Sequence, residues 1–124
     1  MDKCLIDVKG AAHALRQFAQ EREWQQFHSP KNLVMALSGE VGELTEIFQW
    51  MTEADSLSAA SHPQTASAVR DELADVALYL IRLADVLGVD LDAAIASKLA
   101  ANAAKYPVEA SRGVSTKYDR LPKP

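Results

Sequence analysis

Residues 33–51, LVMALSGEVGELTEIFQWM, decide how this chain folds, because two carboxylates interrupt an apolar helical stripe there. With about 100° of rotation per residue, the stripe collects Leu33, Leu37, Leu44, Ile47, Phe48 and Met51. Glu40 falls inside the stripe, and Glu43 lies at its edge, about 60° to one side by the same rotation. A carboxylate that faces a core is costly unless something compensates its charge. The segment therefore predicts a helix and a site on that helix.

Residues 69–87, VRDELADVALYLIRLADVL, repeat the arrangement. Their stripe consists of Val69, Leu73, Val76, Leu80, Leu83 and Leu87. Glu72 falls inside it and Asp75 at its edge, on the same side as in the first segment. The i, i+3 spacing puts both carboxylates of a pair on one side of a helix. Two such helices packed face to face would offer four oxygen ligands to one divalent cation.

Magnesium fits these ligands best, because it prefers carboxylates, waters and phosphate oxygens; Mn²⁺ is the alternative. Such a site suits phosphoryl or pyrophosphoryl chemistry. A di-iron centre needs Glu-x-x-His pairs, and no histidine follows a Glu by three residues in the helical segments. A single Glu-x-x-Glu is common on solvated helix faces, as Glu46 illustrates. Two pairs with the same offset inside apolar stripes favour the metal interpretation.

Composition indicates one all-α domain covering residues 1–124. Apolar residues make up 48% of the chain, and there are only 5 Gly and 5 Pro, which favours helices over strands or disorder. The formal net charge of -4 argues against nucleic acid as a partner, since nucleic-acid binders carry a basic footprint. No apolar run reaches the length of a membrane helix. The single cysteine cannot form an internal disulfide, so a cytoplasmic protein is expected.

Capping residues delimit the helices. Helices are expected at residues 6–22, 30–51, 64–87 and 91–105, with a loop at 52–63 and an irregular tail from 108. Ser29 and Pro30 form an N-cap followed by proline at the first helical position. Gly88 occupies a C-cap position, and Asp90 can cap the next helix. His28, just before the second helix, is interpreted as structural.

The chain resembles the MazG-like, all-α nucleoside triphosphate pyrophosphohydrolases, and most closely their dCTP pyrophosphatase branch. The family signature is Glu-x-x-Glu followed by Glu-x-x-Asp on successive helices, which here is Glu40, Glu43, Glu72 and Asp75. The other matching stretches are residues 18–28, 32–50, 72–76, 79–80, 97–98, 102 and 105–107.

This resemblance implies hydrolysis of a (deoxy)nucleoside triphosphate to the monophosphate and diphosphate, for dCTP or another dNTP, in nucleotide-pool house-cleaning. The implied Mg²⁺ ligands and catalytic residues are Glu40, Glu43, Glu72 and Asp75. The residues expected around the base are Trp24, Trp50 and Tyr79. Those expected at the phosphates or closing the pocket are Lys98, Asn102 and Lys105. Related dCTP enzymes carry a histidine where this chain has Leu15, which weakens a strict expectation of cytosine selectivity.

The resemblance also implies a four-to-five-helix bundle completed by oligomerisation, as a homodimer or a homotetramer made of two dimers. Helices with apolar side chains beyond one stripe support this, because a single chain leaves them uncovered. Two other functions fit the residues. A non-catalytic helical oligomer that binds nucleotide or metal would share the acidic pairs but release no diphosphate. A pure interaction protein would carry the acidic pairs as surface charges.

Overall fold

The computed structural model describes residues 6–123, and every regular element in that range is helical, which confirms the all-α class. The elements are α1 (Val8–Glu21), η1 (Gln25–Phe27), α2 (Pro30–Phe48), α3 (Glu53–Ser56), α4 (Ala66–Leu87), α5 (Leu91–Lys105), α6 (Val108–Ser111) and η2 (Tyr118–Arg120). The described residues fall into two compact parts, 6–89 and 90–123. Among the described helices, none combines the length and the apolarity that crossing a membrane requires.

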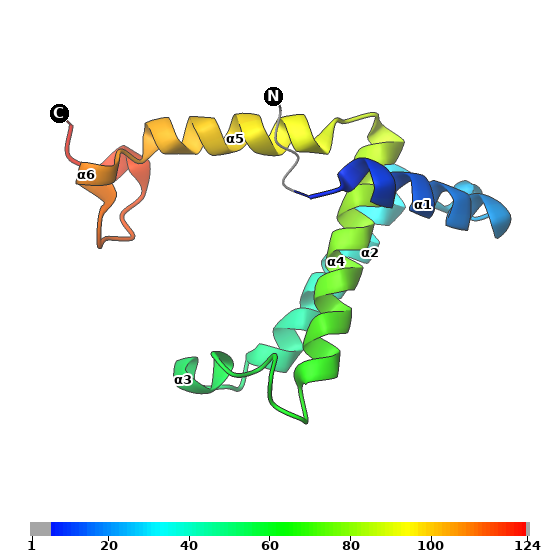
Figure 1. Ribbon diagram of the computed structural model, residues 1–124, viewed down its shortest axis with the longest axis horizontal. Coiled ribbons are helices and arrows are strands. Elements are labelled where there is room, and N and C mark those ends of the chain that lie inside the picture. The colour runs from blue at the N-terminus through cyan, green and yellow to red at the C-terminus, as the bar shows by residue number, and fades with distance from the viewer. Residues whose placement is uncertain (1–5, 124) are drawn as a thin grey trace. The chain divides into compact units, whose positions relative to one another are not determined.

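The first part is built on α2 and α4, which lie side by side and run antiparallel (Figure 1). The helix α1 packs against α4. The predicted caps hold these helices in place. The Ser29 side chain accepts a hydrogen bond from the backbone N–H of Asn32 at 3.2 Å. Gly88 ends α4 in the left-handed conformation, with φ of 69°, which a glycine adopts without steric cost.

The buried apolar core of the described chain is small and belongs to the first part. It consists of Val8, Ala19, Leu33, Ala59, Val69, Ile81 and Ala84. The predicted interior stripe of α4 is wrong at Leu73, Leu80 and Leu87, whose exposed fractions are 54%, 41% and 54%. These leucines are seven residues apart, so they share one face of the helix, and neither α1 nor α2 covers that face in a single chain.

Two segments expected to be irregular contain short helices. The stretch 52–63 begins with α3, because the Thr52 hydroxyl accepts a hydrogen bond from the backbone N–H of Asp55 and caps one turn. The tail contains α6 and η2. Elements of three or four residues are too short for an apolar period to mark them in sequence.

The second part consists of α5, α6 and η2. Asp90 caps α5 as predicted, accepting from the backbone N–H of Ala93 at 3.1 Å. The rings of Tyr106 and Tyr118 meet edge to face, with centroids 6.1 Å apart. The Lys105 ammonium lies 4.8 Å from the Tyr118 ring centroid. No residue of α5 is buried, so its predicted apolar face has no full cover within this part.

Candidate functional site

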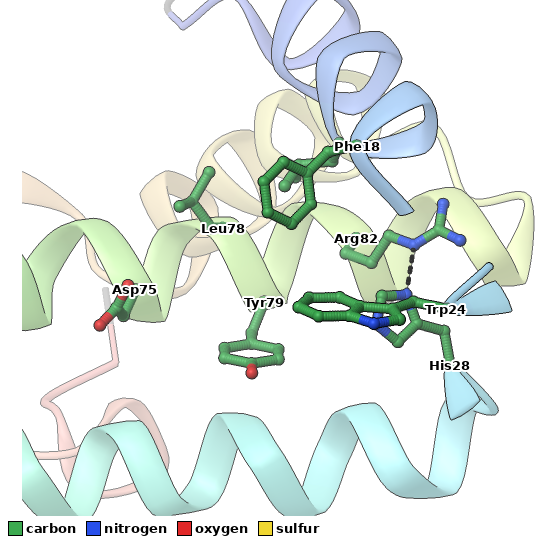
Figure 2. Close-up of a pocket in the computed structure, with 8 residues that line it drawn as sticks. Phe18, Trp24, His28, Asp75, Leu78, Tyr79 and Arg82 are labelled. Atoms are coloured by element: carbon green, nitrogen blue, oxygen red, sulfur yellow. Dashed lines mark hydrogen bonds between the residues drawn. The ribbon is translucent and has the colours of Figure 1, made fainter. Parts of the chain in front are cut away.

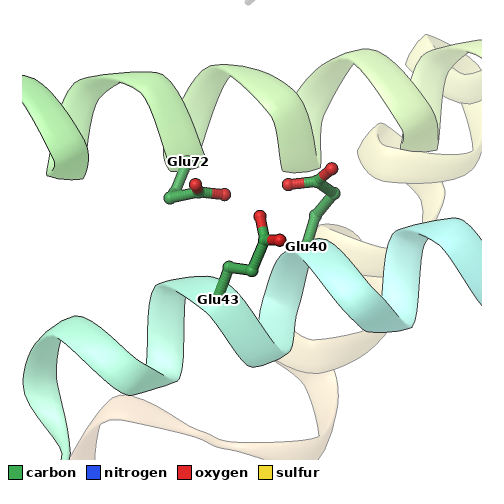
Figure 3. Close-up of side chains that lie close together, drawn as sticks. All are labelled: Glu40, Glu43 and Glu72. Carbon is green, nitrogen blue, oxygen red and sulfur yellow. The ribbon is translucent and has the colours of Figure 1, made fainter.

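Two neighbouring helices bring three carboxylates of the signature together. Glu40 and Glu43 project from α2 toward α4, and Glu72 projects from α4 toward them (Figure 3). One carboxylate oxygen from each residue lies within 4.8 Å of the other two. The i, i+3 spacing on α2 and the antiparallel packing of α2 on α4 produce this convergence. The cluster has the donor chemistry that a hard divalent cation requires.

Glu40 and Glu72 each place one carboxylate oxygen, Oε2, in a buried position without a hydrogen-bond partner. When both groups are ionised, neither has a proton to donate, so the two carboxylates repel each other and lose solvation. A buried acceptor left unpaired costs roughly 1–3 kcal/mol, and more when it is charged. A cation between the helices would remove this cost.

The pKa values of the cluster reflect the same repulsion and loss of solvation. Protonated Glu40 can donate a hydrogen bond to the Glu72 carboxylate; this bond, burial, and the nearby Glu43 and Asp75 raise the pKa of Glu40 from 4.5 to about 7. For Glu72, the hydrogen bond with Glu40 lowers the pKa, but burial and the charges of Glu43 and Asp75 outweigh it, so the pKa rises. Without a cation, the cluster therefore retains a proton near neutral pH.

Asp75, the fourth acid of the signature, lies outside the group of three carboxylates whose ligand atoms converge. Its charge still reaches the cluster, because it contributes to the raised pKa of both Glu40 and Glu72. Asp75 instead lines a neighbouring pocket. It thus stands between the acidic cluster and that pocket.

The pocket has a volume of about 230 Å³ and lies within the first part of the chain (Figure 2). Its lining residues are Leu15, Phe18, Trp24, His28, Asp75, Leu78, Tyr79 and Arg82. Trp24 meets Phe18 edge to face, with ring centroids 5.6 Å apart, and it meets His28 at 6.3 Å. Sites for drug-sized ligands measure about 300–1,000 Å³, so this pocket suits one flat ring flanked by aromatic side chains.

A left-handed turn brings Trp24 to the pocket. Glu23 has φ of 56°, the positive value rarely adopted by a residue with a side chain. The backbone N–H of Trp24 donates to the Ala19 carbonyl, and that of Glu23 donates to the Gln20 carbonyl. These two bonds form a Schellman ending of α1 with glutamate in the place of the usual glycine. The reversal of direction sets the Trp24 ring against Phe18.

A buried arginine closes one wall of the pocket. Arg82 is 7% exposed, and its Nε donates to Nδ1 of His28 at 3.1 Å (Figure 2). Its Nη1 donates to the Asp85 carboxylate at 3.3 Å. Arg16 on α1 donates to the same carboxylate at 2.5 and 3.1 Å. The buried positive charge is therefore paired and hydrogen-bonded.

The structure distributes the other predicted site residues differently. Trp24 and Tyr79 line the pocket. Trp50 follows α2 with an exposed fraction of 88% and does not line it. Lys98, Asn102 and Lys105 lie on α5, in the second part of the chain. Asn102 is half-buried there, and Lys98 is exposed.

Two polar residues of the pocket, His28 and Arg82, are absent from the predicted site residues. The sequence predicts a structural role for His28 and no role in the site for Arg82. A signal for Arg82 was present, because an arginine between Ile81 and Leu83 follows Tyr79 by three residues and thus shares its side of α4. His28 carried no such signal, because it lies outside the regular helices and only the chain path brings it to Arg82.

Comparisons with known proteins agree with these features. The model of the MazG-like family matches residues 35–121. A dCTP pyrophosphatase 1 from Rattus norvegicus is 49% identical over 107 residues, and one from Homo sapiens is 46% identical over 106. Each alignment covers 86% of this chain. The chain spans 63% and 62% of the length of these curated relatives.

A solved structure shares the fold. The crystal structure of a pyrophosphatase from Archaeoglobus fulgidus superposes with a TM-score of 0.74 at 33% sequence identity. The superposition covers 86% of this chain and 98% of that one. The helical arrangement is therefore one that an experimental structure also adopts.

Proposed function

Since this chain belongs to the MazG-like family, we propose that it is a nucleoside triphosphate pyrophosphohydrolase. It converts a (d)NTP and water to the (d)NMP and diphosphate, with dCTP or another dNTP as substrate, and so cleans the nucleotide pool. One observation carries the proposal: two buried carboxylate oxygens without partners stand next to a pocket of aromatic side chains. The activity for which the curated relatives are named supports it.

The cluster fits a divalent cation, because its orphaned oxygens are buried and its donors are all carboxylates. Glu40, Glu43 and Glu72 would hold the ion, with Asp75 as the fourth acidic group. The proposed ion is Mg²⁺, with Mn²⁺ as the alternative, since both take oxygen ligands. When bound, the cation supplies charge neutralisation of the phosphates and polarisation of the phosphorus.

Side chains of the protein bind the base and accept the proton of the attacking water. Trp24 and Tyr79 flank the base, where stacking contributes roughly 1–3 kcal/mol. Glu43 or Glu40 accepts the proton of the water that attacks the α–β phosphoanhydride, and diphosphate leaves. Trp50 is proposed as a third residue around the base. Lys98, Asn102 and Lys105 are proposed to meet the phosphates or close the pocket. Residues 1–124 are proposed to be a single nucleotide pyrophosphohydrolase domain.

A second copy of the chain is the proposed cover for the exposed leucines of α4. Leu73, Leu80 and Leu87 repeat every seven residues, the period at which two helices pack along one seam. On α2, the exposed Val34 and Val41 have the same spacing. We therefore propose a homodimer or a homotetramer made of two dimers. Sedimentation as a monomer at micromolar concentration would contradict this.

The deciding experiment is incubation with the four common dNTPs and Mg²⁺, followed by chromatography of the products. Release of monophosphate and diphosphate is expected, and chelation of the cation should abolish it. Bound but intact triphosphate would instead indicate a non-catalytic nucleotide-binding oligomer. Inorganic phosphate with a diphosphate nucleotide would place the cleaved bond between the β and γ phosphates and reject the proposed reaction.

A further inference from the structure

We propose that His28 is a specificity-determining residue of the nucleotide pocket, held by the positioning residue Arg82 so that it offers a hydrogen-bond donor to the base. The chemistry that this wall recognises is a pyrimidine whose ring nitrogen N3 is an unprotonated acceptor beside the O2 carbonyl, that is, cytosine. The inference rests on the proposed function in taking the pocket as the base site.

The direction of one hydrogen bond fixes the imidazole. Arg82 Nε carries a hydrogen and has no lone pair, so His28 Nδ1 must be the acceptor in their 3.1 Å bond. A neutral imidazole that accepts at Nδ1 carries its hydrogen on Nε2. Burial and the Arg82 charge lower the pKa of His28, which keeps the ring neutral at physiological pH. His28 is therefore held in one tautomer, with Nε2 as a donor.

The ring edge that bears Nε2 is the one left for a ligand, because the edge that bears Nδ1 faces Arg82 (Figure 2). Arg82 adds no acceptor to this wall, since a guanidinium only donates. Among the described residues, its Nη2 has no hydrogen-bond partner. The wall made by His28 and Arg82 thus presents donors only.

Such a wall separates the pyrimidines by a simple rule. Cytosine presents two adjacent acceptors, N3 and O2, whereas uracil and thymine present a donor at N3 between the acceptors O2 and O4, so the rule applies to the donor that faces N3, proposed to be Nε2 of His28. A donor that faces a donor leaves both unpaired, which corresponds to at least about a tenfold loss of affinity. Adenine and guanine add a second fused ring, which a pocket of about 230 Å³ disfavours.

This assignment changes the expectation drawn from Leu15. Leu15 lines the pocket and offers only an apolar contact. The hydrogen bond that identifies the base can be donated instead by His28, which reaches the same pocket from the segment before α2. Selectivity for cytosine therefore does not require a histidine on α1.

Arg82 itself is anchored from two sides. Asp85 accepts from Arg82, and Arg16 on α1 donates to the same carboxylate. The anchor restricts rotation of the guanidinium, so that Nε keeps pointing at His28. The role of Arg82 is thus to hold the tautomer of His28.

The test uses two measurements on the full chain. Calorimetry compares binding of dCMP with that of dTMP and dUMP, which needs no turnover. Initial rates give the ratio of kcat/KM for dCTP to that for dTTP. The variants are His28→Phe, which keeps a flat ring without the donor, Arg82→Met and Arg82→Lys. Arg70→Met is the control, because Arg70 is an exposed arginine of the same helix outside the pocket.

The wild type and Arg70→Met should prefer the cytosine nucleotide at least about tenfold. His28→Phe should abolish most of this preference, and Arg82→Met should lower it, whereas Arg82→Lys, which keeps a donor for Nδ1, should retain it. In the His28→Phe background, Arg82→Met should lower the preference no further, since the two residues act as one unit. Partial unfolding of a variant reduces both rates equally and leaves the ratio unchanged.

Equal binding of the three monophosphates by the wild type, or a preference that survives in His28→Phe, would overturn the inference while leaving the hydrolase intact. The inference also fails if Arg82→Met lowers the preference by the same factor with and without His28. Conversely, selective binding of dCMP without hydrolysis of any dNTP would support the inference and reject the proposed reaction.

Discussion

The two ends of α4 differ in whether their charged side chains have partners: the end near Glu72 is the unpaired end, and the end near Arg82 is the paired end. Near Glu72, carboxylates from α2 and α4 converge, and two of their oxygens are buried without a partner. Near Arg82, a buried guanidinium is bonded to His28 and Asp85, and Arg16 supports the same carboxylate. A buried charge whose partners are all in the chain has a structural role, whereas a cluster of carboxylates without partners is suited to bind a ligand, here a cation.

The largest expected effect comes from neutralising the unpaired end. Glu72→Gln should lower kcat for dNTP hydrolysis by about 10²–10³-fold, since removal of one preorganised electrostatic contact has that effect. Stopped assays with Mg²⁺ would measure it, and circular dichroism should show unchanged helices. Glu46→Gln is the matched control, because Glu46 is an exposed glutamate of α2 outside the cluster. Undiminished turnover in Glu72→Gln would remove the acidic cluster from the reaction.

Breaking the paired end should instead cost stability. Asp85→Asn replaces the charged carboxylate that accepts from Arg82 and Arg16 with a neutral amide, which has one acceptor oxygen instead of two, and leaves a buried positive charge without its counterion. Loss of one partner of a buried ion pair lowers the free energy of unfolding by about 3–5 kcal/mol. Because the Arg16 side chain is exposed, we expect a loss near the lower value. Urea denaturation would measure the change. Asp71→Asn, at an exposed position of α4, should change the unfolding free energy little.

The pH dependence of the metal-free protein should carry opposite signs at the two ends. The folded state raises the pKa of Glu40 from 4.5 to about 7, so between these values it holds a proton that the unfolded chain has lost. Stability should therefore fall as pH rises from 4.5 to 7. Denaturation midpoints across this range would show the slope, and Glu40→Gln or added Mg²⁺ should flatten it. A midpoint that rises over this interval would contradict the assignment.

Asp85 behaves in the reverse direction. Its pKa lies below the ordinary value of 3.8, first because of the hydrogen bond with Arg16 and then through the charges of both arginines, against the effect of burial. Its contribution to stability is therefore complete above the ordinary pKa and is lost as pH falls through the folded pKa. Arg16→Gln should shift the acid-unfolding midpoint to higher pH. An unchanged midpoint would show that the pair contributes nothing in solution.

The smallest effect concerns the turn that delivers Trp24 to the pocket. Glu23→Gly relieves the positive φ, which costs a residue with a side chain about 1–2 kcal/mol, but it adds freedom to the unfolded chain. The net gain in unfolding free energy should be under about 1 kcal/mol, measured by thermal melting. Gln17→Gly, at an exposed position inside α1, should destabilise by roughly 1 kcal/mol instead. A loss of stability in Glu23→Gly would show that the side chain of Glu23 stabilises the turn.

The all-α class, the long helices and their caps follow from local sequence patterns. Ser29, Gly88 and Asp90 act through neighbours within a few residues, so local chemistry identifies them. The convergence of Glu40, Glu43 and Glu72 was also predictable, because i, i+3 spacing within an apolar stripe aims carboxylates at the facing helix. The short helices α3 and α6 were not predictable, because one helical turn has no period to read.

Which face of α4 is covered, and which residues its polar side chains contact, depend on the packing of distant segments. Leu73, Leu80 and Leu87 share the helical period of the buried residues, and the positions of α1 and α2 alone leave them exposed. The meeting of His28 with Arg82, 54 residues later in the chain, depends on how the segment before α2 lies against α4. Periodicity reports the faces of one helix, and contacts between distant segments depend on a chain path that no local pattern encodes.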